Sequence, residues 1–114
     1  MYSPVGKIYI ISSRVDMRKS INALGILMST QYEKNPSTGD KYVFINSHGD
    51  KIKVLYFDGN GFVLHYKRLE KCRVLVERSE GCMLEISPLQ LAGLLSGLEV
   101  KNLKIPGEGC YEAF

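Results

Sequence analysis

The chain has 114 residues, of which 45% are hydrophobic and 24% charged, and its net charge is +3. This length suits one domain with a single core, and the composition excludes a disordered or fibrous protein. No stretch approaches the roughly 18 apolar residues of a membrane span, and the N-terminus lacks the basic and apolar segments of a secretory signal. We therefore expect a cytoplasmic protein that has no membrane partner.

The cysteines argue against a disulfide framework or a zinc site. They are three in number, Cys72, Cys82 and Cys110, and none is spaced as C-x-x-C. We expect reduced thiols, no metal and no cofactor.

A strand followed by a helix is predicted near the N-terminus. The strand is GKIYIIS, and apolar residues then recur at helical spacing at Met17, Ile21, Leu24 and Met28. The predicted helix runs from about Asp16 to Gln31. Asp16 would be its N-cap, or Ser13 and Asp16 would form a capping box.

The middle of the chain predicts several strands. After the loop NPSTGD at 35–40, the segments YVFIN, KIKVLYF, FVLHYKR, RVLVE and MLEIS are separated by short polar turns. Turns this short favour antiparallel neighbours. We therefore predict an α+β fold, with an antiparallel β-meander of about five or six strands and an N-terminal helix and a short C-terminal helix packed on it.

A second helix is predicted after the last of these strands. Ser87, Pro88 and Gln90 form an N-terminal capping pattern, and an apolar face follows. We expect a single domain over residues 1–98. Residues 99–114, which contain one Pro and two Gly, are expected to be a flexible C-terminal tail.

The stretch DGNG at 58–61 has two interpretations. An EF-hand loop starting at Asp58 would need a glycine at its sixth position and a glutamate at its twelfth, where this chain has Val63 and Leu69. The calcium interpretation therefore fails. Asp58, Gly59 and Gly61 instead predict the turn of a β-hairpin.

Positive charge is concentrated in one segment of the chain. Residues 51–78 hold seven cationic side chains against three carboxylates, an excess larger than the whole net charge. In the hairpin within this segment, successive side chains alternate between the two faces of each strand. Lys53 is therefore predicted on one face of its strand, and Lys67 and Arg68 on opposite faces of the partner strand. These cations could contact phosphates, with Tyr56 or Tyr66 stacking on bases. Alternatively, the lysines protect a sheet edge and the aromatic residues fill the core.

Arg18 and Lys19 form a second basic group at the predicted start of the first helix. Cations there oppose the helix dipole, so they could serve to bind an anion. In the alternative interpretation, Asp16 caps the helix and pairs with a neighbouring cation while Lys19 is solvated.

No catalytic motif is present. His48 and His65 could meet a cysteine only through the tertiary fold, and the carboxylates are scattered. A metal-dependent nuclease would need carboxylates such as Asp16, Asp50 or Asp58 to converge. We expect a protein that is not an enzyme.

Three segments, DMRKSINAL, NPSTGDKYVFINSHGDKIKVLYFDGNGFVLHYKRLEKCR and ISPLQLAGLLSGL, resemble the TnpB accessory proteins of the insertion sequence 66 family of bacterial mobile elements. The matching positions are Asp16, Met17, Arg18, Lys19, Pro36, Gly39, Phe44, Gly49, Asp50, Lys53, Leu55, Asp58, Gly59, Gly61, Lys67, Arg68, Leu69 and Glu70. The chain departs from the family pattern by having Ser20-Ile21, Ser47-His48, Cys72 and Val76-Glu77, which lowers its positive charge and aromatic surface.

The resemblance implies a helper of DNA transposition, encoded beside a larger transposase that carries the catalytic acids. We expect it to bind DNA at the element ends through a set of cations: Arg18, Lys19, Lys53, Lys67 and Arg68. Alternatively, the same residues face an acidic partner, and the protein is an adaptor that binds and regulates the transposase.

Overall fold

The computed structural model describes residues 6–71, 73–76, 81–96, 102–105 and 111–112. In chain order its elements are β1 (Ile8–Ile11), α1 (Ile21–Gln31), the 3-10 turn η1 (Pro36–Thr38), β2 (Lys41–Ile45), β3 (Lys51–Asp58), β4 (Gly61–Arg68), β5 (Arg73–Val76), β6 (Cys82–Ile86), α2 (Pro88–Ser96), β7 (Asn102–Ile105) and β8 (Tyr111–Glu112). The predicted α+β class is therefore confirmed.

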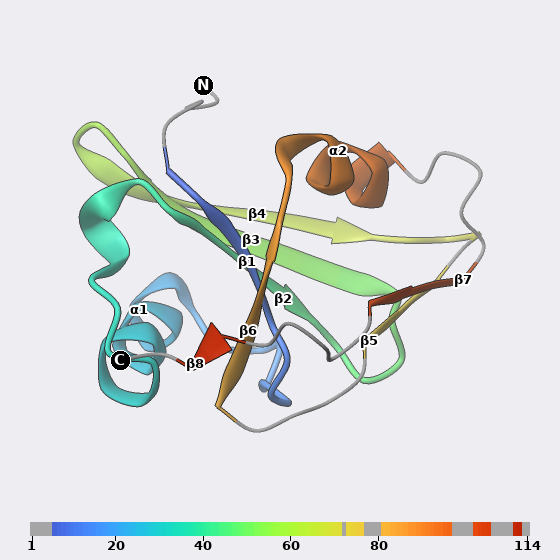
Figure 1. The fold of residues 1–114 in the computed structure, drawn as a ribbon, viewed down its shortest axis with the longest axis horizontal. Coiled ribbons are helices and arrows are strands. Elements are labelled where there is room, and N and C mark those ends of the chain that lie inside the picture. Colours follow the sequence, from blue (N-terminus) through green and yellow to red (C-terminus); the bar gives the residue numbers. More distant parts are fainter. Residues whose placement is uncertain (1–5, 72, 77–80, 97–101, 106–110, 113–114) are drawn as a thin grey trace.

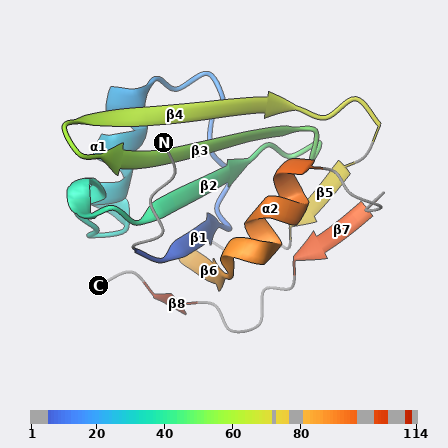
Figure 2. The ribbon, with the colours of Figure 1, turned by 90° about the horizontal axis from the view of Figure 1, so that it is seen from above.

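Six of the strands form one sheet in the order β4-β3-β2-β1-β6-β8 (Figures 1 and 2). β2, β3 and β4 are consecutive and antiparallel, which confirms three strands of the predicted meander of about five or six. β5 pairs with β7 in a separate two-stranded parallel ladder. The short connection after β4 therefore leads out of the main sheet and does not form another hairpin.

The sheet is mixed, because β1 and β2 are parallel. A parallel pair needs a crossover of a dozen or more residues, and α1 lies within the segment that connects these two strands. β1 also pairs with β6 in the antiparallel sense. Turn lengths predicted the meander of β2 to β4, but they carry no information about where β1 is inserted.

The two helices cover opposite faces of the sheet (Figure 2). On one face α1 buries Leu24 and Met28 against Tyr42 and Phe44 of β2. On the other face α2 buries a second apolar cluster, made of Ile8, Ile10, Val43, Ile45, Ile52, Val54, Tyr56, Leu69, Val74, Ile86, Leu91 and Leu94. Every residue of β1 and β2 is buried, because these central strands are covered on both faces.

α1 begins later than predicted. Its N-cap is Ser20, whose hydroxyl accepts a hydrogen bond from the N–H of Ala23. Residues 16–19 form a separate turn, closed by a 3.1 Å hydrogen bond from Lys19 N to Asp16 O. The predicted start at Asp16 and the predicted capping roles of Ser13 and Asp16 are therefore wrong. The Asp16 carboxylate accepts from Arg18 N instead, a local bond that competes with helix formation.

The start of α2 is confirmed. Ser87 Oγ accepts from Gln90 N at 3.1 Å, and Gln90 Oε1 accepts from Ser87 N at 2.7 Å. This reciprocal pair is the capping box, and Pro88 is the first residue of the helix.

The hairpin turn between β3 and β4 is also confirmed. Asp58 and Gly61 are the last paired residues, so Gly59 and Asn60 form a two-residue loop. Gly59 has a φ of +65°, a conformation that glycine adopts without strain, and Asn60 N donates to Asp58 O at 2.6 Å.

Parts of the segment after Leu98 form β7 and β8. Residues 99–101, 106–110 and 113–114 lie outside the described part of the chain, so the boundary at Leu98 and a flexible tail stay predictions. Cys82 is disulfide-bonded, which makes the expectation of a reduced thiol wrong for this residue. Cys72 and Cys110 lie outside the described residues.

Gly49 sits in the turn between β2 and β3, directly against β5. Its φ is +83°, and a Cβ built there would lie 2.2 Å from the carbonyl oxygen of Val74. The carbonyl of Gly49 also accepts a hydrogen bond from Val74 N at 2.8 Å. Only a residue without a side chain allows β5 to approach this turn so closely.

We predict that Gly49→Ala lowers the free energy of unfolding by about 2 kcal/mol or more, because it combines left-handed strain with a backbone clash. Urea denaturation followed by circular dichroism measures this change. The matched control is Gly61→Ala, where φ is not positive and the space is open, and a change within about 0.5 kcal/mol is expected. Equal losses in both variants would contradict the close approach of β5.

Candidate nucleic-acid interface

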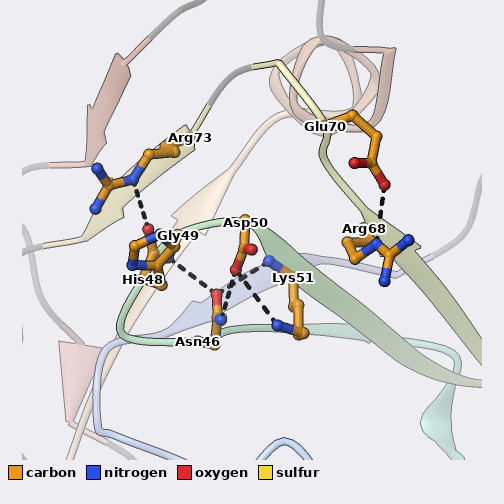
Figure 3. Close-up of polar contacts among 8 residues, drawn as sticks. All are labelled: Asn46, His48, Gly49, Asp50, Lys51, Arg68, Glu70 and Arg73. Atoms are coloured by element: carbon orange, nitrogen blue, oxygen red, sulfur yellow. Dashed lines mark hydrogen bonds and ion pairs between the residues drawn. The ribbon is translucent and has the colours of Figure 1, made fainter.

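The side chain of Asn46 closes the turn between β2 and β3 (Figure 3). Its Oδ1 accepts hydrogen bonds from Gly49 N at 2.9 Å and Lys51 N at 3.0 Å, and its Nδ2 donates to Asp50 Oδ1 at 2.8 Å. The hydrogen bond from Asn46 lowers the pKa of Asp50 from its ordinary value, while burial acts in the opposite direction. The turn is thus held by its own side chains.

Cations from other segments gather around this turn. Arg73 of β5 donates from Nε to the carbonyl of His48 at 2.8 Å, and Arg14, which follows β1, donates to the hydroxyl of Ser47 at 2.9 Å. A polar pocket of about 220 Å³ opens here, lined by His48, Asp50, Leu69, Glu70, Lys71 and Arg73. One end of the sheet therefore carries positive charge from three separate parts of the chain.

Arg68, at the end of β4, lies close to the same turn (Figure 3). Its Nε donates to Glu70 Oε2 at 2.9 Å, and its side chain is 62% exposed. In the register it stands opposite Lys51 of β3. The Lys51 ammonium lies 3.7 Å from the Asp50 carboxylate, so both cations have an acidic neighbour and remain accessible to solvent.

The turn at residues 16–19 presents Arg18 to solvent. Its guanidinium forms two hydrogen bonds with the Asp16 carboxylate, at 3.0 and 2.9 Å, while its side chain stays 90% exposed. These bonds, together with the one from Arg18 N, hold the pKa of Asp16 well below its ordinary value. Asp16 fixes the direction of Arg18. It is the ion pair that the alternative interpretation expected, but it lies outside the helix.

Lys53 of β3 connects this turn to the hairpin through hydrogen bonds. Its ammonium donates to the carbonyl of Met17 and to that of Lys19, the second at 3.3 Å. It also lies 5.6 Å from the ring centroid of Tyr66 on β4. Lys53 is therefore a partly buried positioning residue, which brings Arg18 and Lys19 next to the exposed edge of the sheet.

Four of the five predicted cations share one side of the molecule. Lys53 stands opposite Phe44 and Tyr66 in the register, which places all three on the face that α1 covers. Period-two alternation puts Lys51 and Arg68 on the same face. We call this group the basic surface, and it consists of Arg18, Lys19, Lys51, Lys53, Tyr66 and Arg68.

Lys67 lies on the opposite face. Its ammonium donates to the carbonyl of Leu95 near the C-terminal end of α2, so it neutralises a free helix carbonyl. The structure therefore does not bring Lys67 together with the other four predicted cations. The sequence alternation already separated Lys67 from Arg68, but only the positions of the helices show what each face contacts.

Sequence reasoning did not select Arg14, Lys51 or Arg73 as site residues. Lys51 and Arg73 lie in the basic segment 51–78, and the high local charge of that segment is the sequence feature that could identify them. Arg14 gave no signal, because the tertiary fold alone brings it to Ser47.

Within the described part of the chain, no group of three His, Cys, Asp or Glu residues could hold a metal ion. Asp50 directly precedes β3 and Asp58 is its last residue, so the two lie about 26 Å apart at the rise of an extended strand and cannot share a metal. No helix in the described residues is long and apolar enough to cross a bilayer.

The family model described as "IS66 Orf2 like protein" matches residues 6–105. The chain belongs to this family. Two relatives from Sinorhizobium fredii (strain NBRC 101917 / NGR234) are similar over most of their length: "Uncharacterized protein y4hO", 34% identical over 84% of each chain, and "Uncharacterized protein y4jC", 29% identical over 86% of this chain and 84% of the relative. No solved structure gives a significant match. Membership confirms the resemblance and indicates an accessory protein of an insertion sequence.

We predict that Arg18→Ala raises the pKa of Asp16 toward its ordinary value, because both side-chain hydrogen bonds are lost. A carbon-detected NMR titration of the Asp16 carboxyl measures the midpoint. The pKa of Asp16 is lowered in the folded protein. The stabilisation by its bonds to Arg18 is therefore complete above the ordinary aspartate pKa and is lost as the pH falls through the lowered pKa. Arg68→Ala is the control and should leave the midpoint unchanged. The same midpoint in Arg18→Ala and wild type would contradict this geometry.

We predict that Lys53→Met loosens the turn at residues 16–19, because methionine keeps part of the apolar stem and removes the donor. The expected loss in free energy of unfolding is about 1 kcal/mol, the size of a partly exposed charged hydrogen bond. Hydrogen exchange at Lys19 N, which closes the turn, should become faster. Lys51→Met, on the same strand face, is the control and should change stability by less than about 0.5 kcal/mol. Unchanged exchange in Lys53→Met would show that Lys53 does not hold the turn.

Proposed function

We propose that this accessory protein assists transposition by binding element DNA through the basic surface, without carrying out strand transfer. Phosphate oxygens would accept hydrogen bonds from Arg18, Lys19 and Arg68. Such contacts neutralise the phosphates, release counterions and position the protein on the duplex without reading its sequence.

The observation that carries this proposal is the pairing of two exposed guanidinium groups with exposed carboxylates. Arg18 and Arg68 each bind an acid on their own segment, Asp16 and Glu70 respectively. Exposed ion pairs of this kind contribute little to stability, so exchanging a carboxylate for a phosphate costs little. A guanidinium is planar and its N–H groups match the two oxygens of an oxyanion, so each of these arginines suits two-point binding of a phosphate.

Lys53 has a different role in this proposal from the one predicted from the sequence. Because its ammonium already donates to two backbone carbonyls, it orients the turn that carries Arg18. Tyr66, beside it, is 53% exposed and offers an aromatic surface to an unpaired base or a sugar.

The second candidate is an adaptor whose basic surface faces an acidic region of the transposase. The same exposed pairs of Arg18 and Arg68 support it, since a carboxylate on a partner could replace Asp16 or Glu70. The two candidates differ in their partner and in the salt dependence of DNA binding.

We predict that the wild-type protein binds a labelled element-end duplex with a steep salt dependence. Three phosphate contacts, from Arg18, Lys19 and Arg68, would give a log–log slope of about −2.7. Arg18→Ala and Arg68→Ala should each make that slope shallower by about 0.9 and weaken binding at low salt. Fluorescence anisotropy across a salt series measures both quantities, and a scrambled duplex tests sequence preference.

Lys7→Ala is the matched charge control. Lys7 directly precedes β1, at the end of the sheet opposite the β2–β3 turn, so its loss should leave the slope unchanged. Lys67→Ala should also have little effect, because Lys67 lies on the other face. If the wild type binds neither duplex at low salt, the DNA proposal fails, and a pull-down with the transposase tests the adaptor instead.

A further inference from the structure

Among the strands that the structure describes, β4 is an open edge of the main sheet, because β3 is its one neighbour in the strand order. Its odd-numbered residues bond to β3, as the 2.6 Å bond from Leu69 N to Asp50 O shows at the end of the ladder. In an antiparallel pair the alternate residues direct their N–H and C=O groups the other way. The outward set is Phe62, Leu64, Tyr66 and Arg68, and these groups are a template for another strand.

A groove runs along this edge on the face covered by α2. It is a pocket of about 310 Å³ between β4 and α2, lined by Lys41, Ile52, Val54, Tyr56, His65, Tyr66, Lys67, Leu91 and Leu95. The bond from Lys67 to Leu95 O joins its two walls, so α2 is held at a fixed height above β4. A strand added to β4 would direct alternate side chains toward this groove.

The charge of the groove selects its ligand. Among the described residues that line it there are two lysines and a histidine and no carboxylate. Lys41 is only 3% exposed, and its ammonium lies 5.0 Å from the ring centroid of Tyr56, whose hydroxyl is 3.0 Å from His65 Nε2. Burial lowers the pKa of Lys41. Lys41 is therefore part of the groove's interior, and the exposed His65 and Lys67 beside the edge are the groups that would meet a carboxylate of the ligand.

We propose that β4 and α2 form a docking groove for an extended segment of a partner protein, in which carboxylates alternate with apolar residues. The segment would add to the sheet as a strand antiparallel or parallel to β4. Its backbone would bond to the outward groups of β4, and alternate side chains would enter the groove toward His65 and Lys67. The groove and the basic surface share Tyr66, but the cations of the basic surface lie on the face covered by α1, whereas Lys67 lies on the face covered by α2.

A second copy of this chain fits the edge less well than an acidic segment. From Phe62 to Leu69 the strand carries His65, Lys67 and Arg68 and no carboxylate. Pairing β4 with β4 of another copy would bring cations close to cations across the new ladder, which is unfavourable. The charge of the strand therefore favours a different, acidic partner.

The test uses the full chain labelled with ¹⁵N and three defined peptides of eight residues. In the first, Leu alternates with Glu; in the second, Lys replaces Glu; the third repeats the first with N-methylated backbone at alternate positions. The proposal expects the Glu peptide to bind and to shift the amide signals of Leu64, Tyr66, Leu91 and Leu95. The Lys peptide should not bind, and N-methylation should weaken binding about tenfold or more, since it removes strand hydrogen bonds.

Charge reversal tests the groove directly. Lys67→Glu should weaken binding of the Glu peptide about fivefold or more, and Lys67→Gln should weaken it less. Lys7→Glu, at the other end of the sheet, is the matched control for net charge. Thermal melts by circular dichroism identify any variant that fails to fold, and the signal shifts of the wild type do not depend on any variant.

Three outcomes would overturn the proposal. The first is no binding of the Glu peptide at millimolar concentration, and the second is binding whose shifts fall on residues 14–19 and not on β4 and α2. The third is self-association by sedimentation with shifts on β4 in the absence of peptide, which would assign the edge to a second copy. DNA binding is measured separately, so loss of DNA affinity in Arg18→Ala with intact peptide binding distinguishes the two proposals.

Discussion

Burial of β1 and β2 on both faces is the constraint on which the rest of the molecule depends. These two strands are parallel and central, and every residue in them is buried. Parallel pairing requires the chain to leave the sheet and return, and α1 is part of that excursion. Once α1 covers one face, the apolar residues on the other face need a second cover, which α2 provides through Leu91 and Leu94.

This arrangement separates the cations of one hairpin into two sets. Residues one apart on a strand point to opposite faces, so Lys67 turns toward α2 while Arg68 turns toward the side of α1. Lys67 then neutralises the end of α2, and Arg68 remains exposed beside Lys51. A basic segment that looks continuous along the chain therefore becomes two surfaces with different neighbours. We propose that one contacts phosphates and that the other receives an acidic strand.

Several of the charged side chains form hydrogen bonds to the protein's own backbone. Lys53 donates to the backbone of the turn that carries Arg18, and Arg73 donates to the turn that follows β2. These bonds connect loops from distant parts of the chain, and they determine where the exposed guanidinium groups stand. Asn46 and Gly49 serve the same purpose without charge, since one closes the turn and the other lets β5 approach it.

The sequence by itself determined the features that local chemistry controls. The α+β class, the meander from β2 to β4, the hairpin turn at Gly59 and the capping box of Ser87 all follow from residues close together in the chain. The start of α1 was placed too early, because the bond from Arg18 N to the Asp16 carboxylate competes with a helix cap that sequence spacing also allows. Only the tertiary structure decided the position of β1 beside β2, the pairing of β5 with β7, the fastening of Lys53 and the opposite faces of Lys67 and Arg68. Each of these depends on contacts between residues far apart in sequence, and such contacts leave no periodic pattern in the chain.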